Sequence, residues 1–168
     1  MESYELELFG VKRKLPFINL EDNLAFASFV IMGDTELIMA CAPKLAEKIG
    51  DVDVIITAEA KGIALAYEIS RLLGKKNFIV ARKSIKSYMS GVVSVSVRSI
   101  TTSGEQHLYL DGHDAECLRG KRVCIVDDVI STGESLYALQ ALVESAEGIV
   151  TKKAAVLAEG NAAERDDI

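Results

Sequence analysis

Residues 123–135, which read VCIVDDVISTGES, constrain the fold more than any other part of the sequence. The first four residues are all apolar, which is typical of a strand buried on both faces of a parallel sheet. Asp127 and Asp128 follow where we expect that strand to end. A short turn rich in hydroxyl groups, residues 131–135, then leads into a segment with helical periodicity at 136–143. A strand, a turn of small residues and a helix N-terminus together favour an anion-binding site.

This stretch by itself allows two interpretations. Two carboxylates beside a phosphate-binding turn can accept hydrogen bonds from ribose hydroxyls or approach a divalent cation, which fits a sugar phosphate. Acidic residues followed by Ser, Thr and Gly are also ordinary capping and turn chemistry in many α/β folds. The stretch alone leaves both interpretations open.

The composition narrows the class of protein. The chain has 168 residues, which is enough for one domain with a real core and short for two. Its net charge of −6 argues against a protein that binds nucleic acid mainly through electrostatics. The sequence contains neither an apolar run of membrane-spanning length nor a signal peptide, and its three cysteines lack zinc-site spacing. We therefore expect a cytoplasmic protein with reduced thiols and with neither nucleic acid nor membrane as a partner.

Strand and helix patterns alternate along the rest of the chain. Asp34, Thr35 and Glu36 can cap a helix that ends at Gly50, and valines at every second position near residue 95 predict a strand exposed on one face. Pro16 and its polar neighbours predict a loop or small flap. The expected strands are 4–11, 52–57, 77–81, 90–100, 106–110, 123–126 and 150–157, the expected helices are 35–49, 63–73 and 136–143, and turns are expected at 100–104 and 111–114.

Alternating strands and helices predict an α/β fold with a mostly parallel twisted sheet flanked by helices. We expect one domain over residues 1–168, with a small N-terminal segment at 1–33 and the core at 34–168. The two strands between residues 90 and 110 predict a hairpin that can move over a site.

Basic and small residues follow two other predicted strands. Lys61 lies in a turn of small residues between a strand and a helix, and Arg82, Lys83 and Lys86 follow the strand at 77–81. Each group alone is more typical of a solvated turn or surface than of an anion site. Ligands of open α/β sheets bind at the carboxyl ends of the strands, where these groups and the acidic pair are expected to meet.

The stretch 123–135 resembles the signature of type I phosphoribosyltransferases, which bind 5-phosphoribosyl pyrophosphate (PRPP). That signature has an apolar strand, two acidic residues, variable positions, Thr-Gly, one more residue, and Thr or Ser; here it contains Thr132, Gly133 and Ser135. The turn around Lys61 resembles the family's pyrophosphate loop, and the segment from Arg82 resembles its basic pyrophosphate-binding segment. The resemblance runs from residue 52 to residue 159 and is diffuse before that.

The resemblance implies a type I phosphoribosyltransferase fold with a small N-terminal hood and a flexible hairpin loop. It implies that Asp127 and Asp128 hold the ribose hydroxyls, next to Mg²⁺ that is carried by PRPP without a direct protein ligand. It also implies a homodimer. The remaining implied contacts are Ser131, Thr132, Gly133, Glu134 and Ser135 for the 5′-phosphate, Ala60, Lys61, Gly62, Arg82, Lys83 and Lys86 for pyrophosphate, and Phe17, Ile18 and Asn19 in the hood for the base.

The implied activity is transfer of a 5-phosphoribosyl group from PRPP to a purine, with release of pyrophosphate, in purine salvage. The triplet Ala81-Arg82-Lys83 and the turn around Lys61 look most like adenine enzymes and their xanthine-type relatives. Hypoxanthine-guanine enzymes usually carry Asp where this chain has Ser131. Adenine enzymes often carry Glu in the hairpin turn, whereas residues 99–104 contain no acidic residue, so no proton donor is assigned. The alternatives are a xanthine or orotate phosphoribosyltransferase, a non-catalytic PRPP-sensing regulator, and a domain for another phosphorylated ligand.

Overall fold

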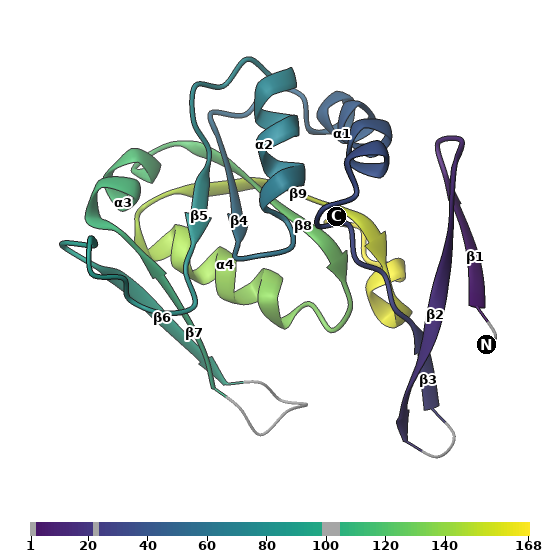
Figure 1. Ribbon diagram of the computed structural model, residues 1–168. Coiled ribbons are helices and arrows are strands. Elements are labelled where there is room, and N and C mark those ends of the chain that lie inside the picture. The colour runs from purple at the N-terminus through teal and green to yellow at the C-terminus, as the bar shows by residue number, and fades with distance from the viewer. Residues whose placement is uncertain (1–2, 22–23, 99–104) are drawn as a thin grey trace.

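The computed structural model describes residues 3–21, 24–98 and 105–168, and its chain forms three sheets and four α-helices within those ranges (Figure 1). The hairpin turn expected at residues 100–104 lies outside the described residues, as does the whole stretch 99–104, in which adenine enzymes often carry Glu. The elements are β1 (Ser3–Leu8), β2 (Val11–Glu21), β3 (Leu24–Ala27), α1 (Thr35–Ile49), β4 (Val54–Ala58), α2 (Ile63–Leu72), β5 (Ile79–Ala81), β6 (Val93–Arg98), β7 (Glu105–Leu110), α3 (Gly112–Leu118), β8 (Arg122–Ile130), α4 (Glu134–Ser145), β9 (Ile149–Ala158) and a final 3₁₀ turn (Gly160–Glu164).

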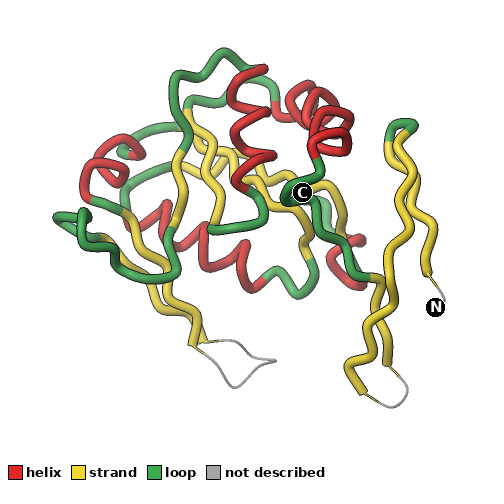
Figure 2. The backbone as a smooth tube through the Cα atoms, in the orientation of Figure 1, coloured by secondary structure: helices red, strands yellow, loops and turns green. Residues whose placement is uncertain are grey.

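The central sheet has the strand order β5-β4-β8-β9, and every neighbouring pair is parallel. This confirms the predicted α/β class, because parallel strands need crossover helices that cover the sheet faces. Helices α1 and α2 lie over one face and α4 lies across the other (Figure 1). The tube view shows the same layers, with helices on both sides of the central strands (Figure 2).

The core is divided by the sheet into two hydrophobic clusters. Cys124 and Val126 of β8 belong to the cluster beneath α1 and α2, whereas Val123 and Ile125 belong to the cluster around α4. All four side chains are fully buried, as their continuous apolar run predicts for a strand covered on both faces. Since successive side chains point to opposite faces, β8 contributes equally to both halves of the core.

Two antiparallel units flank the central sheet on opposite sides (Figure 1). The N-terminal sheet β1-β2-β3 packs against the cluster that contains α1, through Leu15 and Phe29. The hairpin β6-β7 packs against the cluster that contains α4, through Leu108 and Leu110. This hairpin confirms the pair of strands that the alternating valines predict.

Three local predictions are wrong. Residues 11–21 form a strand rather than a loop, because Pro16 lies where β2 exchanges its partner β1 for β3 and its missing N–H is tolerated there. The predicted turn at 111–114 is the start of α3, with the Asp111 side chain accepting a hydrogen bond from the His113 N–H. Strand β8 continues to Ile130, beyond the predicted end at Val126, because it stays paired with β9.

Candidate active site

The acidic pair lies where β8 loses one of its two neighbours. Strand β4 pairs with β8 only as far as Ile125, whereas β9 pairs with it through Ile130. Asp127 and Asp128 therefore belong to the part of β8 that is open on the β4 side. The Asp128 N–H donates to the Asp127 Oδ1 at 2.9 Å, which orders the first carboxylate.

The two carboxylates are poorly solvated in the ligand-free chain. Asp128 is only 4% exposed, and its Oδ2 atom has no hydrogen-bond partner among the described residues. Burial raises the pKa of Asp127 to about 6, and the neighbouring Lys61 opposes part of that shift. A buried carboxylate without full compensation is energetically costly, which is typical of a site that awaits a ligand.

The turn after β4 brings Lys61 toward this pair. Its backbone includes a cis peptide bond between Glu59 and Ala60. At Gly62, a Cβ atom would overlap the Thr57 hydroxyl and lie 3.4 Å from the Val126 carbonyl oxygen. A side chain at position 62 would have to displace the buried Thr57 of β4, which favours glycine in this turn.

The basic segment after β5 is held by an acidic residue that the sequence interpretation did not assign to the site. The Lys83 N–H donates to the Glu59 Oε1 at 2.5 Å. The Glu59 Oε2 lies 3.1 Å from the Arg82 Nε, and its Oε1 lies 3.9 Å from the Lys86 Nζ. Glu59 follows a buried strand directly, and that position was the signal available in the sequence.

The hydroxyl-rich turn forms the start of α4, which begins at Glu134 rather than at the predicted residue 136. Gly133 precedes the helix with φ of +80°, a conformation that favours glycine. The Thr132 Oγ1 accepts from the Glu134 N–H at 3.4 Å. The Arg165 Nη1 lies 2.6 Å from the place that a Cβ on Gly133 would occupy, so the C-terminal segment packs against this turn.

These groups meet at a cavity of about 210 Å³. Six predicted site residues line it, namely Ala60, Lys61, Lys83, Asp127, Asp128 and, from the hydroxyl-rich turn, Ser135. Arg82 and Lys86 connect to it through Glu59. Gly62 closes the turn behind Lys61, while Ser131, Thr132, Gly133 and Glu134 are not among the lining residues. Sequence reasoning did not identify the other lining residues, which are Ala58, Glu59, Gln106, Leu108 and Val129.

Gln106 and Leu108 show that the hairpin forms one wall of this cavity. They occupy alternate positions on β7, so their side chains share one face of the hairpin. That alternation is visible in the sequence, although it does not say which face meets the site. The predicted base contacts Phe17, Ile18 and Asn19 lie on β2 and do not line the cavity.

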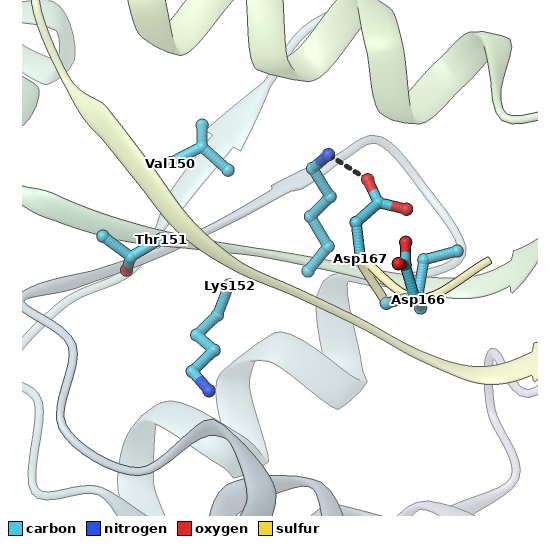
Figure 3. Close-up of a pocket in the computed structure, with 7 residues that line it drawn as sticks. Val150, Thr151, Lys152, Asp166 and Asp167 are labelled. Carbon is cyan, nitrogen blue, oxygen red and sulfur yellow. Dashed lines mark hydrogen bonds and ion pairs between the residues drawn. The ribbon is translucent and has the colours of Figure 1, made fainter.

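A second hollow, of about 350 Å³, lies between β9 and the last residues of the chain. Figure 3 shows Asp167 directed at a lysine of β9, and this bond joins the Lys153 Nζ to the Asp167 Oδ2 at 2.5 Å. Lys152 points away from the acidic residues (Figure 3). This hollow contains none of the residues predicted to bind PRPP.

Residues 34–168 match the profile of a protein family that is described as "Phosphoribosyl transferase domain". The chain belongs to the type I phosphoribosyltransferase family. It is 35% identical over 133 residues to a hypoxanthine/guanine phosphoribosyltransferase of Methanothermococcus okinawensis, covering 78% of this chain and 68% of that protein. It is 36% identical over 124 residues to a protein of the same name from Methanocella arvoryzae, covering 74% of this chain and 60% of that protein.

The solved structures with a similar fold are named for adenine, whereas the sequence relatives are named for hypoxanthine and guanine. An adenine phosphoribosyltransferase from Thermoanaerobacter pseudethanolicus superimposes with a TM-score of 0.71 at 25% identity, over 86% of this chain and 83% of that one. The adenine phosphoribosyltransferase from Saccharomyces cerevisiae also has a TM-score of 0.71, at 20% identity, over 92% of this chain and 89% of that one. The first match supports the family, and the second shows the fold alone.

The site suits Mg²⁺ that arrives with a substrate. The described residues contain no group of three side chains able to hold a metal ion, but Asp127 and Asp128 supply two adjacent carboxylates. Mg²⁺ commonly binds through one or two carboxylates together with phosphate oxygens and water. Within ranges 3–21, 24–98 and 105–168, no helix is both long enough and apolar enough to span a membrane.

Proposed function

We propose that this chain catalyses transfer of the 5-phosphoribosyl group of PRPP to a purine base, with release of pyrophosphate. The observation that carries the proposal is the cavity itself, which joins a basic end at Lys61 and Lys83 to an acidic pair and to Ser135 of the hydroxyl-rich turn. PRPP has this pattern, since a pyrophosphate and a 5′-phosphate flank a ribose with two free hydroxyls. Membership of the phosphoribosyltransferase family supports the same activity.

The basic end is suited to the leaving group. Negative charge grows on pyrophosphate as its bond to the ribose breaks, and pre-positioned cations stabilise that charge most strongly in a site with little water. Lys61 and Lys83 line the cavity directly, and Arg82 and Lys86 lie behind them around Glu59. When bound with PRPP, Mg²⁺ supplies further positive charge to the pyrophosphate.

The acidic pair and the turn at α4 fix the rest of the substrate. Asp127 and Asp128 accept hydrogen bonds from the ribose hydroxyls, and their negative charge favours the positive charge that develops on the ribose ring. Residues 131–135 bind the 5′-phosphate with backbone N–H groups and hydroxyls at the start of α4. Binding energy at this remote phosphate holds the reacting carbon in place without taking part in the reaction.

We assign the choice of base to β2, which lies outside the cavity lining, and to the hairpin, which forms one wall of the cavity. The candidate base contacts are Phe17, Ile18 and Asn19 of β2, together with Gln106 and Leu108 of the hairpin wall. Adenine is the base expected from the motifs, and the adenine names of the structural neighbours agree with it. The sequence relatives named above add hypoxanthine and guanine as competing candidates at higher identity. Both the homodimer and the division at residue 33 stay predictions.

The test is a pyrophosphate-release assay with PRPP, Mg²⁺ and one base at a time. Adenine, hypoxanthine, guanine, xanthine and orotate are compared at equal concentration, with buffer in place of base as the blank. We expect release with at least one purine and the matching nucleotide by chromatography. Tight PRPP binding without turnover of any base would contradict the proposal and favour a PRPP-sensing protein.

A further inference from the structure

Glu59 is an acidic residue at the basic end of a cavity that should bind pyrophosphate. Its side chain is 18% exposed, and Glu59 itself lines the cavity beside Lys61 and Lys83. A carboxylate cannot accept hydrogen bonds from a phosphate oxygen, and its charge repels pyrophosphate. Its presence there requires a role other than contact with the substrate.

We propose that Glu59 is a positioning residue that holds the basic segment 82–86 in the geometry that binds pyrophosphate. This inference rests on the proposed function, because it assigns that segment to the leaving group of PRPP. Glu59 acts through the segment and touches neither substrate.

Two hydrogen bonds of Glu59, one from its backbone and one to its side chain, connect the end of β4 to the segment that follows β5. The Glu59 N–H donates to the Ala81 carbonyl oxygen at 3.0 Å, continuing the pairing of β4 with β5 by one residue. In the other direction, the Lys83 N–H donates to the Glu59 Oε1 at 2.5 Å. The chain between Ala81 and Lys83 is thus fixed to Glu59 at both ends. Between them, Arg82 exchanges two backbone hydrogen bonds of 2.9 Å with Tyr109 of β7, so the start of the segment is held by β7 and by Glu59 together, and the Glu59 side chain is the contact that reaches Lys83.

The charge of Glu59 adds to this geometry. Arg82 and Lys86 both face its carboxylate, with nitrogen–oxygen distances of 3.1 Å and 3.9 Å, while Lys61 and Lys83 line the same cavity. Four cations around one small cavity repel one another when no anion is bound. A partly buried carboxylate among them offsets that repulsion, so the segment keeps its bound geometry before the substrate arrives.

The contacts of the Lys86 side chain indicate how it can change partner from Glu59 to pyrophosphate when the substrate binds. Its Nζ donates to the Ser84 Oγ at 2.6 Å and lies only within ion-pair range of Glu59. Lys86 therefore keeps a short local bond that does not depend on Glu59. When pyrophosphate binds, Lys86 and Arg82 gain a more highly charged partner, whereas the Lys83 N–H bond to Glu59 stays in place.

Three substitutions of Glu59 separate these contributions. Glu59→Ala removes both the acceptor and the charge, Glu59→Gln keeps an oxygen for the Lys83 N–H, and Glu59→Asp is too short to reach Lys83 and Arg82 together. Glu68→Gln is the matched control, because Glu68 also pairs with an arginine, Arg71 at 2.7 Å, but lies on α2 outside the cavity lining. The full chain is titrated with Mg²⁺–pyrophosphate by calorimetry and assayed for PRPP and base kinetics.

We expect Glu59→Ala to weaken pyrophosphate binding and to raise KM for PRPP by about tenfold, with KM for the base changed less than about twofold. Glu59→Gln should regain most of the affinity, because its amide oxygen accepts from the Lys83 N–H. Glu68→Gln should match the wild type. Glu59→Asp serves the same purpose as Glu59→Ala if the alanine variant does not fold.

Two results would overturn the inference. Unchanged pyrophosphate affinity in folded Glu59→Ala and Glu59→Asp would show that the segment holds itself in place. Tighter binding in Glu59→Ala and Glu59→Gln would show that Glu59 only competes with the substrate as an anion. If pyrophosphate binding depends on Glu59 but the wild type transfers the phosphoribosyl group to no base, the inference stands and the proposed function fails. If the wild type transfers the group and pyrophosphate binding does not depend on Glu59, the proposed function stands and the inference fails.

Discussion

Asp127 and Asp128 are neighbours on β8, yet their surroundings differ. Asp127 accepts the Asp128 N–H and lies close enough to Lys61 for its pKa to respond, whereas the Asp128 Oδ2 has no partner among the described residues. Burial holds the pKa of Asp127 near 6, well above the usual value for an aspartate. The ligand-free site therefore keeps an ionised carboxylate at neutral pH at a cost to stability.

This cost predicts that Asp127→Asn is more stable than the wild type at neutral pH. The folded chain binds a proton on Asp127 between about pH 4 and pH 6 that the unfolded chain does not bind, so this residue's contribution to stability falls as the pH rises through that window. Asn removes the charge and keeps the acceptor for the Asp128 N–H. At pH 7.5 we expect the variant to melt roughly 2–4 °C higher.

Calorimetric melting of both proteins from pH 4 to pH 8 checks this expectation. The gain in melting temperature should shrink below pH 5, where the wild-type carboxyl takes up its proton. Ribosyl transfer should fall at every pH, since the variant lacks the charge that faces the ribose. This account is contradicted if the variant melts at a lower temperature than the wild type at pH 7.5. It is also contradicted if the difference in melting temperature does not change with pH.

The boundaries of helices and strands agree with the predictions where they are determined by residues close in sequence, such as helix caps. Helix α1 spans Thr35–Ile49 as predicted, because the Asp34 side chain accepts from the Leu37 N–H and Gly50 ends the helix at positive φ. Helix α3 was missed because its seven residues begin with Gly112, which weakens any helical pattern. The extent of β8 depends on its pairing with β9, and a non-local partner cannot be inferred from a strand's own residues.

The candidate site shows the same division. The acidic pair, the turn at Lys61 and the basic segment follow predicted strands, and sheet topology alone was enough to bring them together. Glu59 and Gln106 required tertiary information, because an acidic residue in a turn and a glutamine on a hairpin are also ordinary surface residues. What distinguishes a site residue from a surface residue is the residue that it faces across the cavity, and the local sequence does not reveal that residue.

The link between β2 and the start of α1 gives a prediction at this scale. The Arg13 Nε donates to the Asp34 Oδ2 at 2.6 Å, and its Nη2 donates to the Asp34 Oδ1 and the Glu36 Oε2 at 2.8 Å each. We expect Arg13→Met to loosen the N-terminal sheet, because it removes a two-pronged contact to the residue that caps α1. Amide hydrogen exchange in β1 and β2 should become about threefold faster or more, with β4 and β8 unchanged.

Lys12→Met is the control, since Lys12 pairs with Glu7 at 3.3 Å on the same hairpin with both side chains largely exposed. The contact with Arg13 lowers the pKa of Asp34, so the contribution of the link is present above the usual aspartate pKa and is lost as the pH falls through the lowered value. Equal exchange in Arg13→Met and wild type at neutral pH would show that apolar packing alone holds the sheet.

At the scale of the whole molecule, the two faces of the central sheet serve two neighbouring units. One cluster joins the sheet to β1-β2-β3 and the other joins it to β6-β7 (Figure 1). The cavity lies between the carboxyl ends of β4 and β8, with the hairpin as one wall. A ligand there contacts β4, β7, β8, the start of α4 and the segment after β5, so its binding should stabilise the central sheet together with the hairpin.

Binding of PRPP with Mg²⁺ should therefore raise the melting temperature. At one hundred times its dissociation constant, a ligand that binds only the folded state adds about 2.7 kcal/mol, or roughly 5–10 °C for a chain of this size. Mg²⁺–pyrophosphate and ribose 5-phosphate each occupy one end of the site and should give smaller shifts. Chelation of Mg²⁺ should remove most of the PRPP shift, and an undiminished shift with EDTA would contradict a role for the metal in binding.

The fit of Gly62 against Thr57 and the Val126 carbonyl has a consequence for how this sequence can change over time. Any amino-acid replacement of Gly62 introduces at least a Cβ atom, and the nearest obstacle to that atom is the hydroxyl of a fully buried threonine. Drift at position 62 is therefore blocked while Thr57 is retained, and it becomes permissible only after position 57 has lost its hydroxyl. In a lineage that keeps this turn, the replacement at position 57 therefore comes before any replacement at position 62.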